Sequence, residues 1–520
     1  MIRTSKTDPL QINEVLCGGG VIGLTLCPGK KGDSIFGAPW DRELAADVGA
    51  IREWAATTVL TLIEDHEFDL LEVRGLAAAV RETGMTWLHA PIRDVDVPDE
   101  AFERQWSVVG HKVRAELRRA NRVLIHCRGG RGRAGMIAAR LLVELGESPA
   151  EAIKRVREAR PGAIETAAQE AHVKSVQLRP GHDHDDRVLG CLFGGAVGDA
   201  FGYAVEFDRL QEIRRRHGAD GLTQPQLQAG KFIVSDDTQM TLFTAEALNR
   251  AGSVDGFIDE CRAAYLRWYE TQTGRPGESE EGLLTYAPLW KRRAPGNTCM
   301  SALAQGGRGT IGLRVNDSKG CGGVMRTAPI GLVRRWDERT AFELGAAAAA
   351  LTHGHPSGFF SAAAMSAIIR NLLDGTDLTV AIDRASHLLS GYAEAKDTQN
   401  AMERAVAFAR RCQDRQDVAR GALGEGWVGE EALAIAIYSC LVGSDFEDTM
   451  RIAANHDGDS DSTASIAGQL FGARWGFESM PWLWVEPLDV FDAVCEAAGR
   501  LGLPPANDAS KGILVGRTLA

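Results

Sequence analysis

The sequence predicts two domains of different fold class, an α/β domain over residues 1–178 and an all-α domain over residues 188–520. The length of 520 residues is one indication, because a single hydrophobic core rarely serves so long a chain. A second is that strand-like and helix-like segments alternate up to about residue 174, whereas Gly/Ala-rich helical stretches recur after it. The polar Pro/Gly segment at 179–187 is the expected linker.

The first domain follows the order strand, strand, helix, strand, helix. Residues 57–63 and 86–90 are rich in β-branched and apolar side chains and predict two strands. Apolar residues at helical spacing then mark one face of a helix, namely Phe102, Trp106, Val109, Val113 and Leu117. Residues 122–126 predict a buried strand, and a glycine-rich loop joins it to a helix predicted over 134–145.

The second domain is predicted to consist of closely packed helices. Small residues on helix faces let helix axes approach closely. Gly194, Gly198 and Gly202 are spaced four apart, and their segment has no lysine for a nucleotide loop, so helix packing is the preferred interpretation of these glycines. The predicted helices span 189–203, 238–248, 342–351, 359–373 and 432–442.

Net charge, apolar runs and cysteine spacing limit the partners and the compartment that we expect for this protein. The net charge of −12 is spread over isolated acids and bases, so nucleic acid is not an expected partner. No apolar run reaches the roughly 18 residues of a membrane span, and the N-terminus has no signal-peptide pattern. The ten cysteines form no CxxC pair, which suits a reducing compartment. We therefore expect a cytoplasmic enzyme without a membrane partner.

The loop from His126 to Gly135 combines a nucleophile with an anion site. Cys127 and Arg133 lie six positions apart between the predicted strand and helix. The loop glycines, including Gly130 and Gly132, let N–H groups converge on a phosphate at the helix N-terminus, where Arg133 can grip two oxygens. The positive electrostatic field of the helix N-terminus and Arg133 also favours a thiolate at Cys127. The expected phosphate-binding residues are His126, Arg128, Gly130 and Gly132.

This loop resembles the signature of the cysteine-dependent dual-specificity phosphatases, and the closest likeness is to kinase-associated phosphatase. The likeness extends upstream through Pro91-Ile92-Arg93-Asp94 and Pro98-Asp99, and downstream through Gly162-Ala163-Ile164-Glu165-Thr166. It implies a cysteine-phosphatase-like fold, a phosphorylated substrate and a general acid at Asp94, with Asp96 as the alternative. Ala134 departs from the family, which has Ser or Thr there to help expel the thiolate. A structural turn and a phosphate-binding module without turnover are the alternatives.

Two acidic clusters more than two hundred residues apart predict a metal site. They are Ser235-Asp236-Asp237-Thr238 and Asp457-Gly458-Asp459-Ser460-Asp461-Ser462-Thr463. Carboxylates brought together in a fold repel one another, and a hard cation such as Mg²⁺ compensates them. A calcium loop is excluded, because Ser462 and Gly468 stand where its template needs Gly and Glu. Two helix N-caps with solvated acids remain the alternative.

Together with three further motifs, these clusters resemble the ADP-ribosylglycohydrolase family over about residues 186–500. The further motifs are Gly198-Asp199-Ala200-Phe201-Gly202 with Glu206, Gly320-Cys321-Gly322-Gly323-Val324-Met325-Arg326, and His353-Gly354-His355-Pro356. The resemblance implies an all-α fold with two Mg²⁺ ions. The implied ligands are Ser235, Asp236, Asp237, Asp459, Asp461 and Ser462, where the two serines replace threonines.

The resemblance also implies the reaction, removal of ADP-ribose from a modified protein or related acceptor through an oxocarbenium-like state. Asp236 or Asp237 would activate water, and Glu206 would act near the scissile bond or gate access. The backbone at Gly320, Gly322 and Gly323 would approach the diphosphate. His353 and His355 would line the adenosine side or serve the structure.

The sequence thus indicates a bifunctional hydrolase, with two alternatives. In one, only the glycohydrolase is active and the first domain binds phosphorylated substrate. In the other, both domains are pseudoenzymes that bind ADP-ribose and phosphate as a scaffold.

Overall fold

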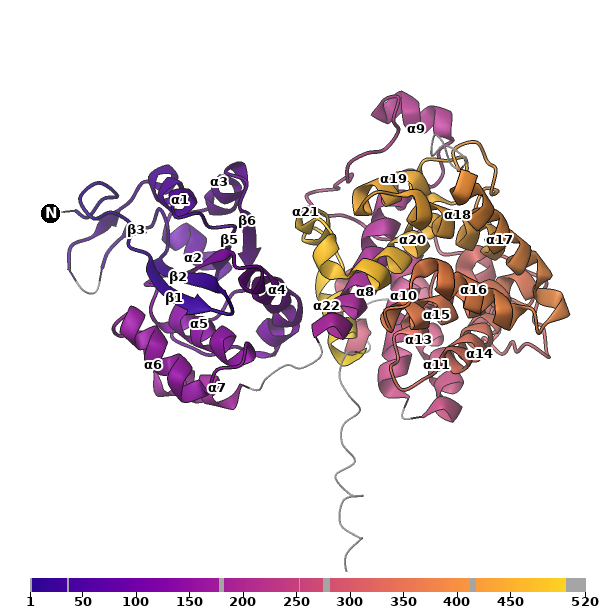
Figure 1. Cartoon of the computed structure of the whole chain (residues 1–520), viewed down its shortest axis with the longest axis horizontal. Coiled ribbons are helices and arrows are strands. Elements are labelled where there is room, and N and C mark those ends of the chain that lie inside the picture. Colours follow the sequence, from indigo (N-terminus) through magenta and orange to yellow (C-terminus); the bar gives the residue numbers. More distant parts are fainter. Residues whose placement is uncertain are drawn as a thin grey trace, which may run out of the picture. The chain divides into compact units, whose positions relative to one another are not determined.

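The computed structural model describes residues 2–34, 37–176, 182–251, 253–274, 281–411 and 418–501. The chain divides into two compact units, Met1–His182 and Asp183–Ala520 (Figure 1). The first contains a sheet covered by helices and the second is helical, so both predicted fold classes are confirmed. Helix α8 begins at His182, inside the range predicted as a linker, and residues 179–181 of that range lie outside the described residues.

A five-stranded sheet forms the centre of the first unit, in the order β1-β2-β7-β5-β6. The strands are β1 (Asn13–Cys17), β2 (Gly20–Leu26), β5 (Thr58–Thr61), β6 (Thr86–His89) and β7 (Arg122–Cys127). The central strand β7 runs parallel to β2 and β5, whereas the edge strand β1 is antiparallel to β2. Strands β3 (Lys31–Gly32) and β4 (Trp40–Asp41) pair separately. Because β7 is flanked on both sides, its end at Cys127 is held by neighbouring backbone.

Helices cover this sheet and supply its core. They are α1 (Leu44–Glu53), α2 (Asp65–Leu70), α3 (Leu76–Glu82), α4 (Glu100–Arg118), α5 (Gly132–Glu144), α6 (Pro149–Ala159) and α7 (Ala167–Ser175). A buried cluster joins Val48 and Ile51 of α1 and Leu76 of α3 to Val59 and Leu124 of the sheet. Every residue of α5 is buried, including its first turn. This burial fixes the position of the N-terminus of α5, which follows the glycine-rich loop.

The second unit is a helical bundle. Its longer helices are α8 (His182–Tyr203), α9 (Leu210–His217), α10 (Asp236–Arg250), α11 (Val254–Thr273), α12 (Asn297–Ala304), α14 (Glu338–Ala350), α15 (Pro356–Leu373), α16 (Leu378–Leu389), α17 (Lys396–Arg411), α18 (Gly429–Val442), α19 (Phe446–Ala454), α20 (Ser460–Trp475) and α22 (Phe491–Leu501). Single-turn helices α13 (Ala328–Gly331) and α21 (Trp482–Val485) complete it. None of the helices among the described residues combines the length and apolar character of a membrane span.

Helices α8 and α20 cross in backbone contact. A Cβ atom at Gly194, Gly198 or Gly202 would overlap a backbone carbonyl of α20, and one at Gly468 would overlap the carbonyl of Gly194. The prediction that these glycines serve helix packing is therefore confirmed. This crossing brings the acidic start of α20 close to the C-terminal end of α8. Asp199 lies near that end of the helix, and Glu206 follows three residues after it.

Candidate active sites of the two units

The phosphate loop of the first unit connects β7 to α5. Cys127 is the last residue of β7 and is almost wholly buried. Its sulfur accepts a hydrogen bond from the Gly130 amide at 3.2 Å, so the loop backbone curls over the Cys127 thiol. Gly130 has φ +70°, and a Cβ there would overlap the Thr25 carbonyl at the end of β2. Only glycine fits between Cys127 and the neighbouring strand.

Arg133, in the first turn of α5, is a fixed guanidinium rather than a mobile one. It is 2% exposed and donates to both Glu67 carboxylate oxygens, at 2.6 and 2.9 Å, and to the Ile92 carbonyl at 2.9 Å. Burial works against the charged form, but the hydrogen bond and charge of Glu67 outweigh it and raise the Arg133 pKa. Such a bidentate pair fixes the plane of the Arg133 guanidinium, and therefore the orientation in which it can bind a phosphate.

The loop after β6 brings Asp94, rather than Asp96, to Arg133. An Asp94 oxygen lies 2.7 Å from Nη2 of Arg133, while its side chain stays 43% exposed. The Asp96 carboxylate instead accepts the amide of Val97 at 2.9 Å. Between the two acids, Val95 has φ +65°, a strained conformation for a β-branched residue.

Two residues of the predicted site, His126 and Ala134, are buried in the sheet and in α5. His126 is wholly buried within the sheet, where Nε2 lies 2.8 Å from the Thr61 hydroxyl and burial lowers the His126 pKa to about 3. Ala134 is buried in α5 and offers no hydroxyl. A Cβ at Gly132 would come within 2.4 Å of the Glu165 carboxylate, so the Glu165 side chain would have to shift to admit one.

Sequence reasoning missed two charged residues at this loop. Glu67 pairs with Arg133, and its only local signal is its capping box with Glu64 at the start of α2. Lys30 follows β2, and its ammonium donates to the Arg128 carbonyl at 3.2 Å. Arg128 itself is partly exposed and lies 3.8 Å from Asp94. No spacing in the sequence links Lys30 or Glu67 to this loop. Lys30 lies 98 positions before Arg128, and Glu67 lies 66 positions before Arg133.

In the second unit, the acidic start of α10 is held by α8. Ser235 is the N-cap residue and accepts the Asp237 amide at 3.2 Å. The Asp199 carboxylate accepts the amides of Ser235 and Thr238 at 2.9 and 3.0 Å, and the Thr238 hydroxyl at 2.5 Å. Burial raises the Asp199 pKa to about 6. Asp199 therefore orients the start of α10 through two backbone amides and the Thr238 hydroxyl.

The second acidic cluster starts α20. Asp459 is its N-cap residue and accepts the Ser462 amide at 3.2 Å, and Asp461 accepts the same amide at 2.9 Å. The Cys321 thiol donates to Asp459 at 2.8 Å. Asp457 lies apart, since it is exposed and accepts the Leu210 amide at 2.6 Å. The sequence motif contained Cys321, but nothing in its pattern indicated this contact.

Buried negative charge accumulates where the two helix starts meet. Burial, together with repulsion from neighbouring carboxylates, raises the pKa of Asp236 to about 8 and of Glu206 to about 9. The same causes raise the pKa values of Asp237 and Asp461 well above their ordinary range. Asp237 Oδ2 and Glu206 Oε2 are buried, and neither has a hydrogen-bond partner among the described residues. An oxygen-rich set with excess negative charge and unsatisfied atoms fits a hard divalent cation.

The glycine loop borders this cluster through Cys321, and His353 packs against the loop. The loop forms a short 3-10 helix, Cys321–Gly323, and the Cys321 amide donates to the Trp427 carbonyl at 3.2 Å. His353 is buried against Gly322, 2.9 Å from the Thr352 hydroxyl, and burial lowers its pKa to about 3. His355 caps α15 by accepting the Ser357 amide at 3.1 Å.

Comparison with known proteins agrees with this division of the chain. A family model described as ADP-ribosylglycohydrolase matches residues 180–509, and one described as a Swiss Army Knife DSP-PTPase phosphatase domain matches residues 43–173. An uncharacterised Archaeoglobus fulgidus protein is 29% identical over 326 residues, 61% of this chain and 96% of its own.

Two named relatives each match one part of the chain. An ADP-ribosylarginine hydrolase of Serratia proteamaculans is 26% identical over 327 residues, covering 62% of this chain and 81% of the relative. Cyclin-dependent kinase inhibitor 3 of Rattus norvegicus is 29% identical over 163 residues, covering 31% and 73%. The first unit is thus similar to dual-specificity phosphatases, and the chain belongs to the ADP-ribosylglycohydrolase family.

Proposed function

We propose that the helical unit is a Mg²⁺-dependent ADP-ribosylhydrolase with two ions, and that the α/β unit is a cysteine-dependent phosphatase. The observation that carries the first part is the meeting of buried, partly unsatisfied carboxylates at the starts of α10 and α20. Solvated helix caps, the alternative interpretation, do not explain carboxylates buried beside one another. The phosphatase part rests on Cys127 under its loop and Arg133 between Glu67 and Asp94.

The ions would be held by oxygen ligands from both helix starts, namely Ser235, Asp236, Asp237, Asp459, Asp461 and Ser462. When bound, Mg²⁺ supplies charge stabilisation and orients ribose hydroxyls. Asp199 keeps the start of α10 in place, and Cys321 does the same for Asp459. Glu206, buried with one free oxygen, would take or give a proton at the glycosidic bond. His353 would support the glycine loop that approaches the diphosphate.

In the α/β unit, the Cys127 thiolate would attack phosphorus while Arg133 and the loop amides hold the equatorial oxygens. Asp94 would protonate the leaving oxygen, and then accept a proton from the water that hydrolyses the phosphocysteine. Arg128 and the loop glycines would line the phosphate, with His126 as buried support beneath.

A pair of variants tests both assignments on the full chain. Asp459→Asn with Asp461→Asn is expected to abolish Mg²⁺-dependent ADP-ribose release and to leave aryl-phosphate hydrolysis unchanged. Cys127→Ser is expected to do the reverse. ADP-ribose release that survives the first variant would contradict the metal site, because the two carboxylates it removes are central ligands.

A phosphate-binding module without turnover is a second candidate for the α/β unit. Ala134 favours it, because the helix offers no hydroxyl at that position to assist thiolate departure. If aryl-phosphate hydrolysis is slow, Ala134→Ser distinguishes the two: a gain in turnover supports the phosphatase, and unchanged turnover supports the binding module.

The substrate of the helical unit is proposed to be an ADP-ribosylated protein. The similarity to a relative named ADP-ribosylarginine hydrolase makes an arginine-linked substrate the first to test. Substrates that differ only in the ADP-ribosyl linkage should therefore be compared with Mg²⁺ present. A preference for another linkage would reassign the acceptor and leave the catalytic site as proposed.

A further inference from the structure

The phosphate loop of the α/β unit carries more positive charge than one phosphate needs. Three arginines lie in the loop and first helical turn: Arg128, Arg131 and Arg133. Two more cations reach its backbone from outside. Lys30 donates to the Arg128 carbonyl at 3.2 Å, and Arg160 donates to the Gly129 carbonyl at 3.1 Å. Both lie close enough to Cys127 for their charges to interact with the thiol.

The acidic residues around the loop compensate this charge only in part. Glu67 and Asp94 both pair with Arg133, and Arg128 lies 3.8 Å from Asp94. The charge of Glu165 acts on Arg160. Arg131 is exposed, and among the residues that the structure describes its guanidinium has no acidic partner. An uncompensated arginine at the rim is available for a second anion.

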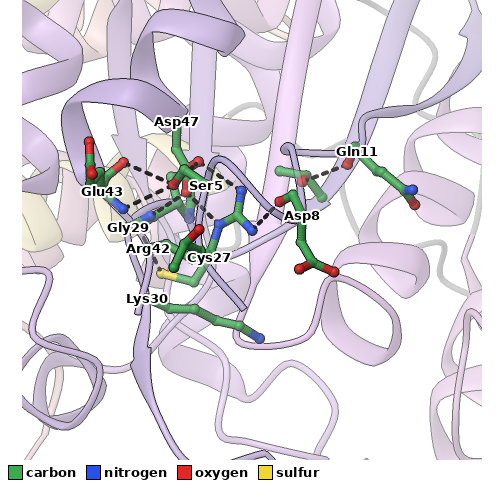
Figure 2. A network of polar contacts seen from close by, with 12 residues as sticks. Ser5, Asp8, Gln11, Cys27, Gly29, Lys30, Arg42, Glu43 and Asp47 are labelled. Carbon is green, nitrogen blue, oxygen red and sulfur yellow. Dashed lines mark hydrogen bonds and ion pairs between the residues drawn. The ribbon is translucent and has the colours of Figure 1, made fainter. Parts of the chain in front are cut away.

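Lys30 is buried beside the loop and is held there by its neighbours. It is 9% exposed, and its ammonium lies 4.8 Å from the centre of the Trp40 ring. A buried network holds its turn: Arg42 pairs with Asp47 at 2.7 Å, and Asp47 accepts the Gly29 amide at 2.8 Å (Figure 2).

Burial lowers the Lys30 pKa to about 8, so keeping an ammonium there costs desolvation. A bound anion at the loop would offset that cost. The next residue, Lys31, is by contrast half-exposed and lies 3.5 Å from Asp41.

We propose that the α/β unit takes a small phosphate ester that carries a second phosphate group. The first phosphate occupies the loop at Cys127 and Arg133, and the second binds Arg131 and Arg128 at the rim. Lys30 and Arg160 compensate the added negative charge through the loop backbone. This inference rests on the phosphatase-like site proposed above. It favours small bisphosphates over a singly phosphorylated peptide, which would leave Arg131 without an anion.

Binding to the full chain carrying Cys127→Ser tests the proposal by calorimetry. Glucose 6-phosphate and glucose 1,6-bisphosphate differ by one phosphate, and neither contains adenine, which the helical unit would bind. We expect the bisphosphate to bind at least about tenfold more tightly, an advantage that falls with added salt. Arg131→Gln should remove most of this advantage and change glucose 6-phosphate affinity less than about twofold.

Arg118→Gln is the matched control, because Arg118 is also exposed but lies at the end of α4. It should leave both affinities unchanged. Equal affinities for the two sugar phosphates, tighter binding of a phosphotyrosine peptide, or an equal effect of Arg118→Gln would each overturn this inference alone. If neither sugar phosphate nor inorganic phosphate binds, the phosphate loop itself is wrongly assigned and the inference fails with it.

Discussion

The proposed role of Glu206 in proton transfer can be distinguished from metal ligation by the residues around it. It is buried with an unpartnered oxygen, yet it lies outside both acidic clusters in the sequence. A proton-transfer role differs from ligation in its signature, because the amide of Gln keeps the shape but cannot carry the proton.

Glu206→Gln is therefore expected to lower kcat for ADP-ribose release by about a hundredfold or more, with little change in Mg²⁺ affinity. Calorimetric Mg²⁺ titration beside steady-state kinetics checks both. Asp457→Asn is the control, since this acid is exposed and only accepts the Leu210 amide. If Mg²⁺ affinity falls in parallel with kcat, Glu206 is a ligand instead.

His126 makes the α/β unit sensitive to acid. Its folded pKa of about 3 lies below the ordinary value of 6.5, so the folded state excludes a proton that the unfolded state binds. Stability from this residue is present above pH 6.5 and is lost as the pH falls towards 3. The loss is about 1.4 kcal/mol per pH unit.

His126→Asn should remove that slope. Urea unfolding of wild type and variant at pH 7 and 5 should show a free-energy difference between them that shrinks by about 2 kcal/mol at pH 5. A difference that is the same at both pH values would contradict a neutral, buried imidazole.

At the scale of elements, the α8–α20 crossing positions the second acidic cluster. Gly194→Ala is expected to destabilise the helical unit by about 2 kcal/mol or more, because its Cβ would overlap the Gly468 carbonyl. Gly256→Ala in α11 is the control, where the nearest atom would lie at 3.8 Å and the change should be neutral or stabilising by up to about 1 kcal/mol. Thermal and urea unfolding measure both. Equal effects would show that the crossing tolerates side chains.

Elements with strong periodicity were predictable, and those defined by distant pairing were not. The helix over α4 and the strand β7 were predicted from local pattern, because their apolar residues repeat at the right period. Strands β1 and β2 were missed, because glycines at 18–20 interrupt the pattern and β2 becomes a strand by pairing with β7. The ligand candidates came from motifs, whereas Glu67, Lys30 and the Cys321 contact depend on tertiary packing.

At the scale of the whole chain, each unit is compact by itself and has its own candidate site. Differential scanning calorimetry should resolve two transitions, and about 10 mM Mg²⁺ should raise only one, because an ion that binds the folded form stabilises that unit alone. The Asp459→Asn, Asp461→Asn chain should lose this shift. A Mg²⁺ shift that persists in the variant, or one that affects both transitions, would place the ions elsewhere.

The central claim is that the buried carboxylates of α10 and α20 form the centre that releases ADP-ribose. The most direct measurement is the rate of ADP-ribose release from an arginine-linked ADP-ribosylated peptide by the full chain, with Mg²⁺ and after its removal by EDTA. Release is expected to stop with EDTA, to return with Mg²⁺, and to be absent at every Mg²⁺ concentration in the Asp459→Asn, Asp461→Asn chain. Release that continues in EDTA, or in that variant, would contradict this claim.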